Sequence, residues 1–250
     1  MCRKSARATH TVRVWWSPSA ARRAPAMHTE APYDYIRDYY SLVHRKNAED
    51  PRVSEFWLSK LAHVRGDSVL NIGCGPTLYD YMLRFERPPR EYVGLDINKS
   101  TFEFLERSKD PRLLDAKARV RELGTHTELI GADVFDCEGS LEGRFDCILG
   151  VGFFATFHGP RFERLLGIMA RALRPAGLLV KLTWHGPHRT AEETRKKLEY
   201  AYDNSEEPSP DDLVTGFEGA GFSLVEQEIL ECDAQSYGWN AIQSCVFRKV

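Results

Sequence analysis

Short apolar runs alternate with amphipathic stretches along the chain from residue 68 onward. The apolar runs, which predict strands, cover residues 68–72, 91–96, 127–130, 145–151, 178–183, 222–230 and 241–248. The stretches between them that repeat apolar residues every three or four positions predict helices over 77–85, 100–107, 111–123, 161–173, 191–202 and 211–220. Such alternation is typical of an α/β fold, in which helices cover both faces of a largely parallel sheet.

The two ends of this pattern differ from its middle. No helix separates the last two strands, so we expect them to pair antiparallel. Two further helices precede the sheet, over residues 32–45 and 53–64, and the first has a wide aromatic face that includes Tyr35, Tyr39 and Tyr40. We expect residues 30–66 to form a helical lid over the main domain, residues 67–250. The alternative is that these tyrosines only pack the helix onto the sheet.

Charge is distributed unevenly along the 250 residues. Residues 1–29 hold six Lys and Arg and no acid, a charge of +6, so the total of −2 leaves −8 for residues 30–250. A mildly acidic body argues against a nucleic-acid partner, which needs a basic surface. The basic start is a targeting-like segment, a disordered arm, or translated upstream sequence before a working start at Met27. We expect it to be mostly unstructured.

Neither a membrane span nor a metal site is expected from the sequence. The longest uninterrupted apolar stretches have only a few residues, against the roughly 20 that cross a bilayer. None of the six cysteines is at metal-ligand spacing from another. His185 and His188 are separated by Gly-Pro, which breaks any helix that could aim both at one ion. Free thiols in a chain of this size favour a reducing compartment, and we expect the cytoplasm.

Candidate ligand-binding residues follow three successive strands. The first strand ends in Asn71-Ile72-Gly73-Cys74-Gly75, where two glycines let the backbone turn sharply against a ligand. The second ends at Asp96, and a carboxylate there can accept hydrogen bonds from both hydroxyls of a ribose. Asp133 follows the third strand and can accept from the exocyclic amine of a purine, with Val134 beside the ring. Together these residues predict a nucleoside site, although the loop matches neither the dinucleotide nor the phosphate-binding motif.

These three motifs, in register over residues 53–250, resemble the class I S-adenosylmethionine (SAM) methyltransferases. The resemblance implies a Rossmann-like sheet of seven strands in the order 3-2-1-4-5-7-6, with strand seven antiparallel. It also implies that SAM is the cofactor and which residues contact it: Gly73, Cys74 and Gly75 at the methionine part, Asp96 at the ribose, Asp133 and Val134 at the adenine, and Gly150 and Val151 beside the sulfonium. Ile97, next to Asp96, is a further candidate cofactor contact. This family usually has an acid where this chain has Asn71, which cannot neutralise the ammonium group of SAM.

Motifs that define several branches of this family are absent. The fourth strand is not followed by the Pro-Pro motif of base amino methylation, and no Pro-Cys pair or strand-tip carboxylate occurs, so a small-molecule substrate is expected. The strand is followed instead by Phe153-Phe154-Ala155-Thr156-Phe157-His158. Aromatic faces attract sulfonium cations, and His158 could act as a general base. We therefore take Tyr39, Phe154 and His158 as the candidate catalytic residues; core packing is the other explanation for the phenylalanines.

Three functions remain open from the sequence. The first is methyl transfer to a small metabolite. In the second, the amine of SAM attacks its own γ-carbon, closing azetidine-2-carboxylate and releasing methylthioadenosine; this is similar to azetidine-2-carboxylate synthases and, more distantly, nicotianamine synthases. The third is a non-catalytic SAM-binding partner subunit. The methyl acceptor and the oligomeric state cannot be read from the sequence.

Overall fold

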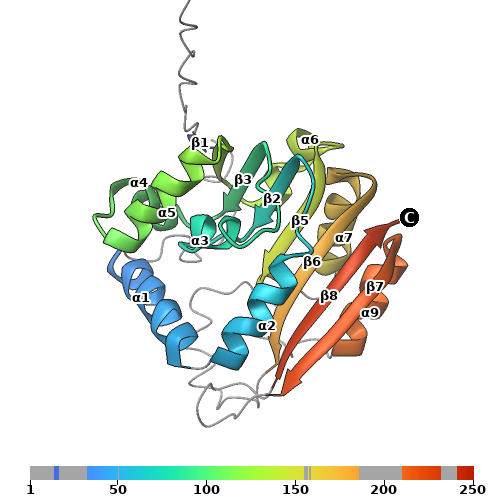
Figure 1. Ribbon diagram of the computed structural model, residues 1–250. Coiled ribbons are helices and arrows are strands. Elements are labelled where there is room, and N and C mark those ends of the chain that lie inside the picture. The colour runs from blue at the N-terminus through green and yellow to red at the C-terminus, as the bar shows by residue number, and fades with distance from the viewer. Residues whose placement is uncertain are drawn as a thin grey trace, which may run out of the picture.

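The computed structural model describes residues 14–16, 33–49, 51–154, 157, 159–185, 210–231 and 241–250. One eight-stranded sheet lies at its centre, in the order β1-β4-β3-β2-β5-β6-β8-β7 (Figure 1). The strands are β1 (Val14–Trp16), β2 (Ser68–Ile72), β3 (Glu91–Asp96), β4 (His126–Gly131), β5 (Phe145–Val151), β6 (Leu173–His185), β7 (Phe222–Glu231) and β8 (Ala241–Lys249). The longer helices are α1 (Tyr33–Glu49), α2 (Pro51–Leu61), α4 (Lys99–Arg107), α5 (Pro111–Glu122), α7 (Gly159–Ala172) and α9 (Pro210–Gly219). The short ones are α3 (Leu78–Met82), the 3-10 turn η2 (Val134–Asp136) and α6 (Glu138–Leu141).

The predicted strand order is confirmed. From β4 to β7 the sheet runs in the order 3-2-1-4-5-7-6, counting from β2 as the first strand. The strand β8 pairs antiparallel with both β6 and β7, whereas β2, β3, β4 and β5 pair in parallel. This is the sheet of the class I methyltransferase fold. It brings the loops after β2, β3, β4 and β5 to one edge, because parallel strands end on the same side.

The structure adds an edge strand that the sequence pattern did not predict. Residues 14–16 of the basic N-terminal segment form β1, which pairs in parallel with β4 from Val14↔Leu129 to Trp16↔Gly131. Valine and tryptophan favour extended backbone, but three residues are too few to show a period within a polar segment. The other residues of 1–29, and the helix expected over 191–202, lie outside the described residues.

The strand β6 begins earlier than expected. The helix α7 ends at Ala172 and β6 starts at Leu173, whereas the sequence predicted the strand from residue 178. Phe145 pairs with Leu173 and Cys147 pairs with Leu178, so extra residues of β6 are bulged out between these pairs. Ala176, at φ 60°, supplies the sharp backbone turn inside this bulge. The Pro-Ala-Gly sequence therefore interrupts the strand instead of preceding it.

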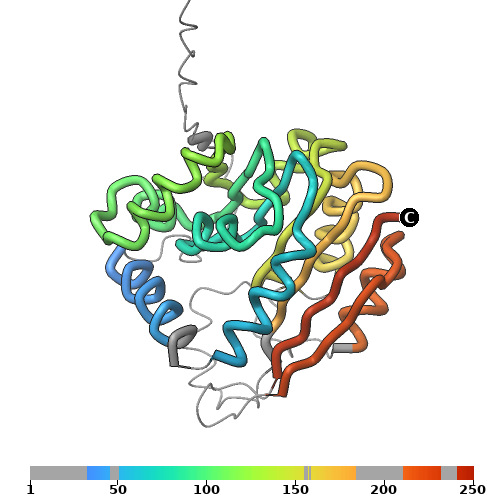
Figure 2. The backbone as a smooth tube through the Cα atoms, viewed as in Figure 1, coloured from blue at the N-terminus to red at the C-terminus, as the bar shows by residue number. Residues whose placement is uncertain are grey.

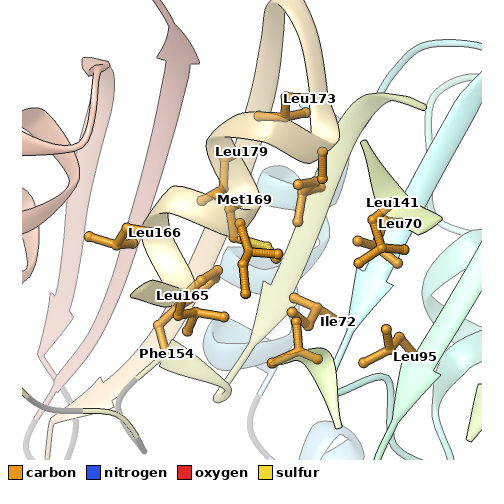
Figure 3. Close-up of a cluster of buried hydrophobic side chains, with 14 of the residues drawn as sticks. Leu70, Ile72, Leu95, Leu141, Phe154, Leu165, Leu166, Met169, Leu173 and Leu179 are labelled. Atoms are coloured by element: carbon orange, nitrogen blue, oxygen red, sulfur yellow. The ribbon is translucent and has the colours of Figure 1, made fainter. Parts of the chain in front are cut away.

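Two hydrophobic clusters cover the two faces of the sheet. On one face, side chains of β2, β3 and β5 pack with α7 and α9, and Figure 3 shows Phe154 next to Leu165 of α7. On the other face, α1, α3, α4 and α5 pack over the same strands. All five residues of β2 are buried, as expected of the central strand. Figure 2 traces the chain from α2 into β2, which places the two N-terminal helices on the side of the sheet that holds the second cluster.

Candidate active site

The glycine loop after β2 turns because two of its residues adopt left-handed backbone. Gly73 has φ 60° and Gly75 has φ 54°, values that side chains disfavour. Gly73 also lies against the ring of Phe153, since a Cβ at this position would be 2.5 Å from Phe153 Cδ2. The Cys74 N–H donates to the carbonyl of Leu95 at 3.1 Å, which fixes the loop to β3. The loop is thus held between β3 and the segment that follows β5.

Asp96 lies at the end of β3 and connects the glycine loop to the loop that follows β3. One carboxylate oxygen accepts from the Gly75 N–H at 3.0 Å, and the other accepts from the Asn98 N–H at 2.8 Å. Burial raises the pKa of Asp96, while these backbone N–H groups and that of Ile97 lower it. The placement beside the glycine loop is the one expected from the sequence. Contact of Asp96 and Ile97 with a ribose stays a prediction.

Asp133 lies at the end of the next strand and caps the turn η2. Its side chain accepts from the Phe135 N–H at 3.1 Å, and burial raises its pKa. Val134 is buried, and the guanidinium groups of Arg161 and Arg164 lie 5.0 and 4.9 Å from the ring centroid of Phe135. Asp96 pairs with Gly131 across β3 and β4, so Asp133 follows at the same edge of the sheet. The three motifs therefore meet where a nucleoside site was predicted.

Aromatic side chains fill the segment after β5. The ring of Phe154 is buried and lies over Gly150, where a Cβ would be 2.3 Å from Phe154 Cε2. The ring of Phe153 is 5.5 Å from that of Phe154 and 4.9 Å from that of Phe157. Val151 is half-buried at the end of β5. His158, the proposed base, lies outside the described residues.

Asn71 is buried and hydrogen-bonded to a residue that the sequence did not single out. Its Nδ2 donates to the Tyr92 hydroxyl at 2.9 Å, and that hydroxyl donates to the Leu78 carbonyl at 3.2 Å. Asn71 Oδ1 is also buried and has no hydrogen-bond partner in the described part of the chain. The neutral side chains of Asn71 and Tyr92 thus occupy the position at which the class I methyltransferases that this sequence resembles usually have an acid. Only the register of β2 and β3 identifies Tyr92, because in sequence it reads as an ordinary strand residue.

Of the tyrosines of α1 that were expected to form the lid, Tyr40 is buried and Tyr39 is partly exposed. Tyr40 is fully buried, with its ring 5.2 Å from that of Phe104 in α4 and its hydroxyl 3.4 Å from the Asp80 carboxylate that accepts from it. Tyr39 is 38% exposed, so it does not belong to this packing. For Tyr40, the packing explanation is therefore correct. The catalytic role of Tyr39 stays a prediction.

A stacked aromatic pair that the sequence did not predict, Trp57 and Tyr81, lies beside the glycine loop. Trp57 of α2 stacks on Tyr81 of α3, with ring centroids 6.4 Å apart and planes 11° apart. A hydrogen bond joins the side chains of Tyr81 and Thr77, the residue at which the loop turns into α3. Tyr81 lies within the helix predicted over residues 77–85 and Trp57 within the one predicted over 53–64, so the sequence pattern singled out neither as a site residue. The pair brings α2 next to the loop.

Comparison with known proteins agrees with this geometry. A family model described as a methyltransferase domain matches residues 70–181. A comparison with curated protein sequences finds no match.

Three solved structures illustrate the similarity of fold. A Burkholderia thailandensis 1,6-didemethyltoxoflavin-N1-methyltransferase, with bound 1,6-didemethyltoxoflavin and S-adenosylhomocysteine, is 18% identical over 91% of this chain and 93% of its own, with a TM-score of 0.55. A SAM-dependent methyltransferase from Mesorhizobium loti is 16% identical over 77% of this chain and 97% of its own, with a TM-score of 0.54. The [4+2]-cyclase SpnF is 14% identical over 79% and 80%, with a TM-score of 0.51. At these identities the similarity concerns the fold alone.

The described residues hold neither a membrane-spanning helix nor a cluster of metal ligands. No helix there is long and apolar enough to cross a membrane. No group of three or more His, Cys, Asp or Glu side chains there could hold a metal ion.

Proposed function

We propose that this protein transfers the methyl group of SAM to a small-molecule acceptor, because a methyltransferase-domain model matches residues 70–181 and the fold is similar to that of a SAM-dependent methyltransferase. The observation that carries the small-molecule assignment is the aromatic segment after β5. Phe153 lies against Gly73, and Phe154 lies against Gly150, so bulky apolar side chains occupy the strand end where the resemblance places the sulfonium. An enclosure of this kind suits a compact acceptor better than a nucleic-acid strand.

The residues at the strand ends fit the parts of the cofactor. The two left-handed glycines leave backbone without side chains on which the methionine part can lie. Asp96 is fixed by two backbone N–H groups, and each of its oxygens keeps a lone pair for a ribose hydroxyl. Asp133, held by the Phe135 N–H, would accept from the adenine amine. We propose these as the cofactor contacts, with Val134 and Ile97 beside the rings.

For methyl transfer from SAM, the main task of the protein is to position the reactants. The acceptor nucleophile attacks the methyl carbon in line with the carbon–sulfur bond, and the neutral thioether S-adenosylhomocysteine is a good leaving group. The phenylalanines would exclude water and orient the acceptor, which is where such a site gains most of its rate. Their faces also attract a cation, by about 0.5–2 kcal/mol for each ring when water is excluded. We propose that α1 and α2 act as the lid, with the exposed Tyr39 facing the site when it is loaded.

Incubation of the protein with SAM alone tests the proposed reaction. If methyl transfer is the reaction, SAM persists until an acceptor is supplied, and S-adenosylhomocysteine then appears. A library of small nucleophiles, scored by mass spectrometry for a gain of one methyl group, identifies the acceptor. Accumulation of methylthioadenosine without any acceptor, faster than in a control without protein, would contradict methyl transfer.

One observation favours a second candidate, the cyclisation of SAM. The acid usual in this family is replaced by Asn71, whose amide is bonded to the neutral Tyr92 hydroxyl. Without a carboxylate beside it, the amine of SAM gives up its proton more easily and can then act as a nucleophile. Its nitrogen would bond to the γ-carbon as the carbon–sulfur bond breaks, and methylthioadenosine would leave. The SAM-only incubation separates this reaction from methyl transfer by its product.

A cytoplasmic location completes the proposal. Cys74, Cys137, Cys147 and Cys245 are free and buried thiols in the described part of the chain. Thiols persist in reducing compartments such as the cytoplasm. Fractionation of cells that express the full chain tests this placement.

A further inference from the structure

A row of buried polar side chains crosses β6 and β8, apart from the residues assigned to the cofactor. Lys181, Thr183 and Gln243, which we call the polar row, are each fully buried. Lys181 pairs with Cys245, and Thr183 pairs with Gln243, across the antiparallel ladder. Residues directly opposite each other share a face of the sheet. Cys245 belongs to the hydrophobic cluster that contains Phe154, so the polar row lies on that same face.

Lys181 is an ammonium group in this apolar layer with a neutral partner. Its Nζ donates to Gln243 Oε1 at 2.7 Å, and no carboxylate forms an ion pair with it within the described part of the chain. Burial of a charge without a countercharge is costly, and a chain that only needed packing here would be more stable with an apolar residue. The bond to Gln243 uses one of the three ammonium protons.

Thr183 adds a second unsatisfied group two residues along the strand. Its Oγ1 is buried and has no hydrogen-bond partner in the part of the chain that the structure describes. Buried hydroxyl groups nearly always have partners in folded proteins. A cationic donor that has no countercharge and a hydroxyl group that has no partner in the described part of the chain therefore lie on one face of β6.

The strand register places this row beside the proposed reaction centre. Ile72, the last residue of β2, pairs with Gly150, and Gly150 pairs with Lys181. Lys181 is thus level with the residue before the glycine loop. The ring of Phe154 lies over Gly150, the immediate neighbour of Lys181. Thr183 lies further toward the C-terminal end of β6, the edge at which the cofactor residues gather.

We propose that the polar row binds a carboxylate of the methyl acceptor, with Lys181 Nζ and Thr183 Oγ1 donating to its oxygens. The inference rests on the proposed function, because it places the acceptor on the Phe154 side of the cofactor. It makes the acceptor an organic acid whose apolar body lies against the phenylalanines. The carboxylate supplies the countercharge that Lys181 lacks and the acceptor that Thr183 lacks.

The protonation of Lys181 suits this role. Burial lowers the pKa of Lys181 to about 8, which leaves most of the amine protonated at neutral pH. The titratable group that faces it from β8 is the Cys245 thiol, whose pKa is raised by burial and lowered by Lys181. A neutral thiol does not compete with a carboxylate for the ammonium group.

Calorimetry on the full chain saturated with S-adenosylhomocysteine tests the proposal. The probes are benzoate, an aromatic carboxylate, and benzamide, which is neutral and has nearly the same shape. We expect benzoate to bind at least about tenfold more tightly than benzamide, a difference of about 1.4 kcal/mol. Equal affinities, or no benzoate binding to the loaded protein, would overturn the proposal.

Two substitutions assign the preference to the polar row. Lys181→Met keeps the length of the side chain and removes the charge, so the preference for benzoate should disappear. Thr183→Val keeps the shape and removes only the hydroxyl, so benzoate affinity should fall severalfold in a protein that folds normally, since Oγ1 has no partner to lose. Lys117→Met, at a half-buried lysine on α5, is the matched control and should keep the preference. Unchanged benzoate affinity in Thr183→Val overturns the proposal even where Lys181→Met does not fold.

The affinity for SAM keeps this inference separate from the proposed function. SAM should bind the wild type and both variants equally well. Failure of SAM to bind the wild type would contradict the proposed function itself. Weaker SAM binding in both variants would instead assign the polar row to the carboxylate of the cofactor, and would overturn its assignment to the acceptor.

Discussion

Asp96 shapes the glycine loop as well as the predicted ribose contact, because its oxygens accept from Gly75 and Asn98. Asp96→Ala would remove the two charge-assisted hydrogen bonds that we propose to the ribose, each worth roughly 1.5–3 kcal/mol, and would leave the Gly75 N–H without its acceptor. We expect the affinity for SAM to fall at least tenfold, a loss of about 1.4 kcal/mol or more, as measured by calorimetry. Asp115→Ala, at an exposed acid of α5 paired with Arg119, is the control and should bind SAM as the wild type does. Unchanged affinity in Asp96→Ala would show that the ribose lies elsewhere.

Lys181 makes the stability of the protein depend on pH in the alkaline range. The pKa of Lys181 is about 8 in the folded chain, against 10.5 ordinarily, so between these values the unfolded chain binds more protons. Stability therefore rises with pH across this window. Measured against Lys181→Met, the free energy of unfolding of the wild type should increase by about 2–3 kcal/mol from pH 8 to pH 10.5, as followed by chemical denaturation. A difference that does not change with pH would mean that the amine is not buried as the structure has it.

At the scale of elements, helix α1 has an inner tyrosine and an outer one. Tyr40 is fully buried against Phe104, so Tyr40→Ala should destabilise the fold by about 3–5 kcal/mol, as other large-to-small core substitutions do. Tyr39 is 38% exposed, although burial raises the pKa of its hydroxyl to about 12, so Tyr39→Ala should destabilise the fold by only about 1 kcal/mol. If α1 is the lid, Tyr39→Ala should still lower the turnover of SAM several-fold. Wild-type turnover in a stable Tyr39→Ala variant would remove Tyr39 from the catalytic residues.

At the scale of the whole molecule, β1 brings the basic N-terminal segment into the sheet. A chain that begins at Met27 lacks β1 and leaves the edge of β4 unpaired. Because a three-residue strand forms few ladder bonds, each worth about 0.5–1.5 kcal/mol, we expect this chain to fold and to melt a few degrees lower than the full one. Thermal denaturation of both chains, with SAM affinity as a second measurement, checks this. An unchanged melting temperature would show that β1 contributes nothing to stability.

The sequence predicted best what short-range patterns control. The bounds of β2, β3 and β5 agree with prediction to the residue, because each is an apolar run that ends at a glycine, an acid or a half-buried valine. The positions of Asp96 and Asp133 followed from the same strand ends. The sequence could not show the bond between Asn71 and Tyr92, the stack of Trp57 on Tyr81, or the polar row. Each of these depends on register between segments far apart in the chain, which periodicity within one segment does not encode.

The rate at which the Cys74 thiol in the glycine loop is alkylated reports how often this loop opens. Cys74 is 2% exposed, and burial raises its pKa well above the ordinary value, so alkylating reagents can attack it only after the loop opens locally. The rate at which iodoacetamide labels Cys74, read peptide by peptide in a mass spectrometer, then measures how often the native loop exposes its backbone. A ligand that holds Gly73 and Gly75 closed slows this labelling in proportion to its occupancy, without any need to know which acceptor the enzyme methylates.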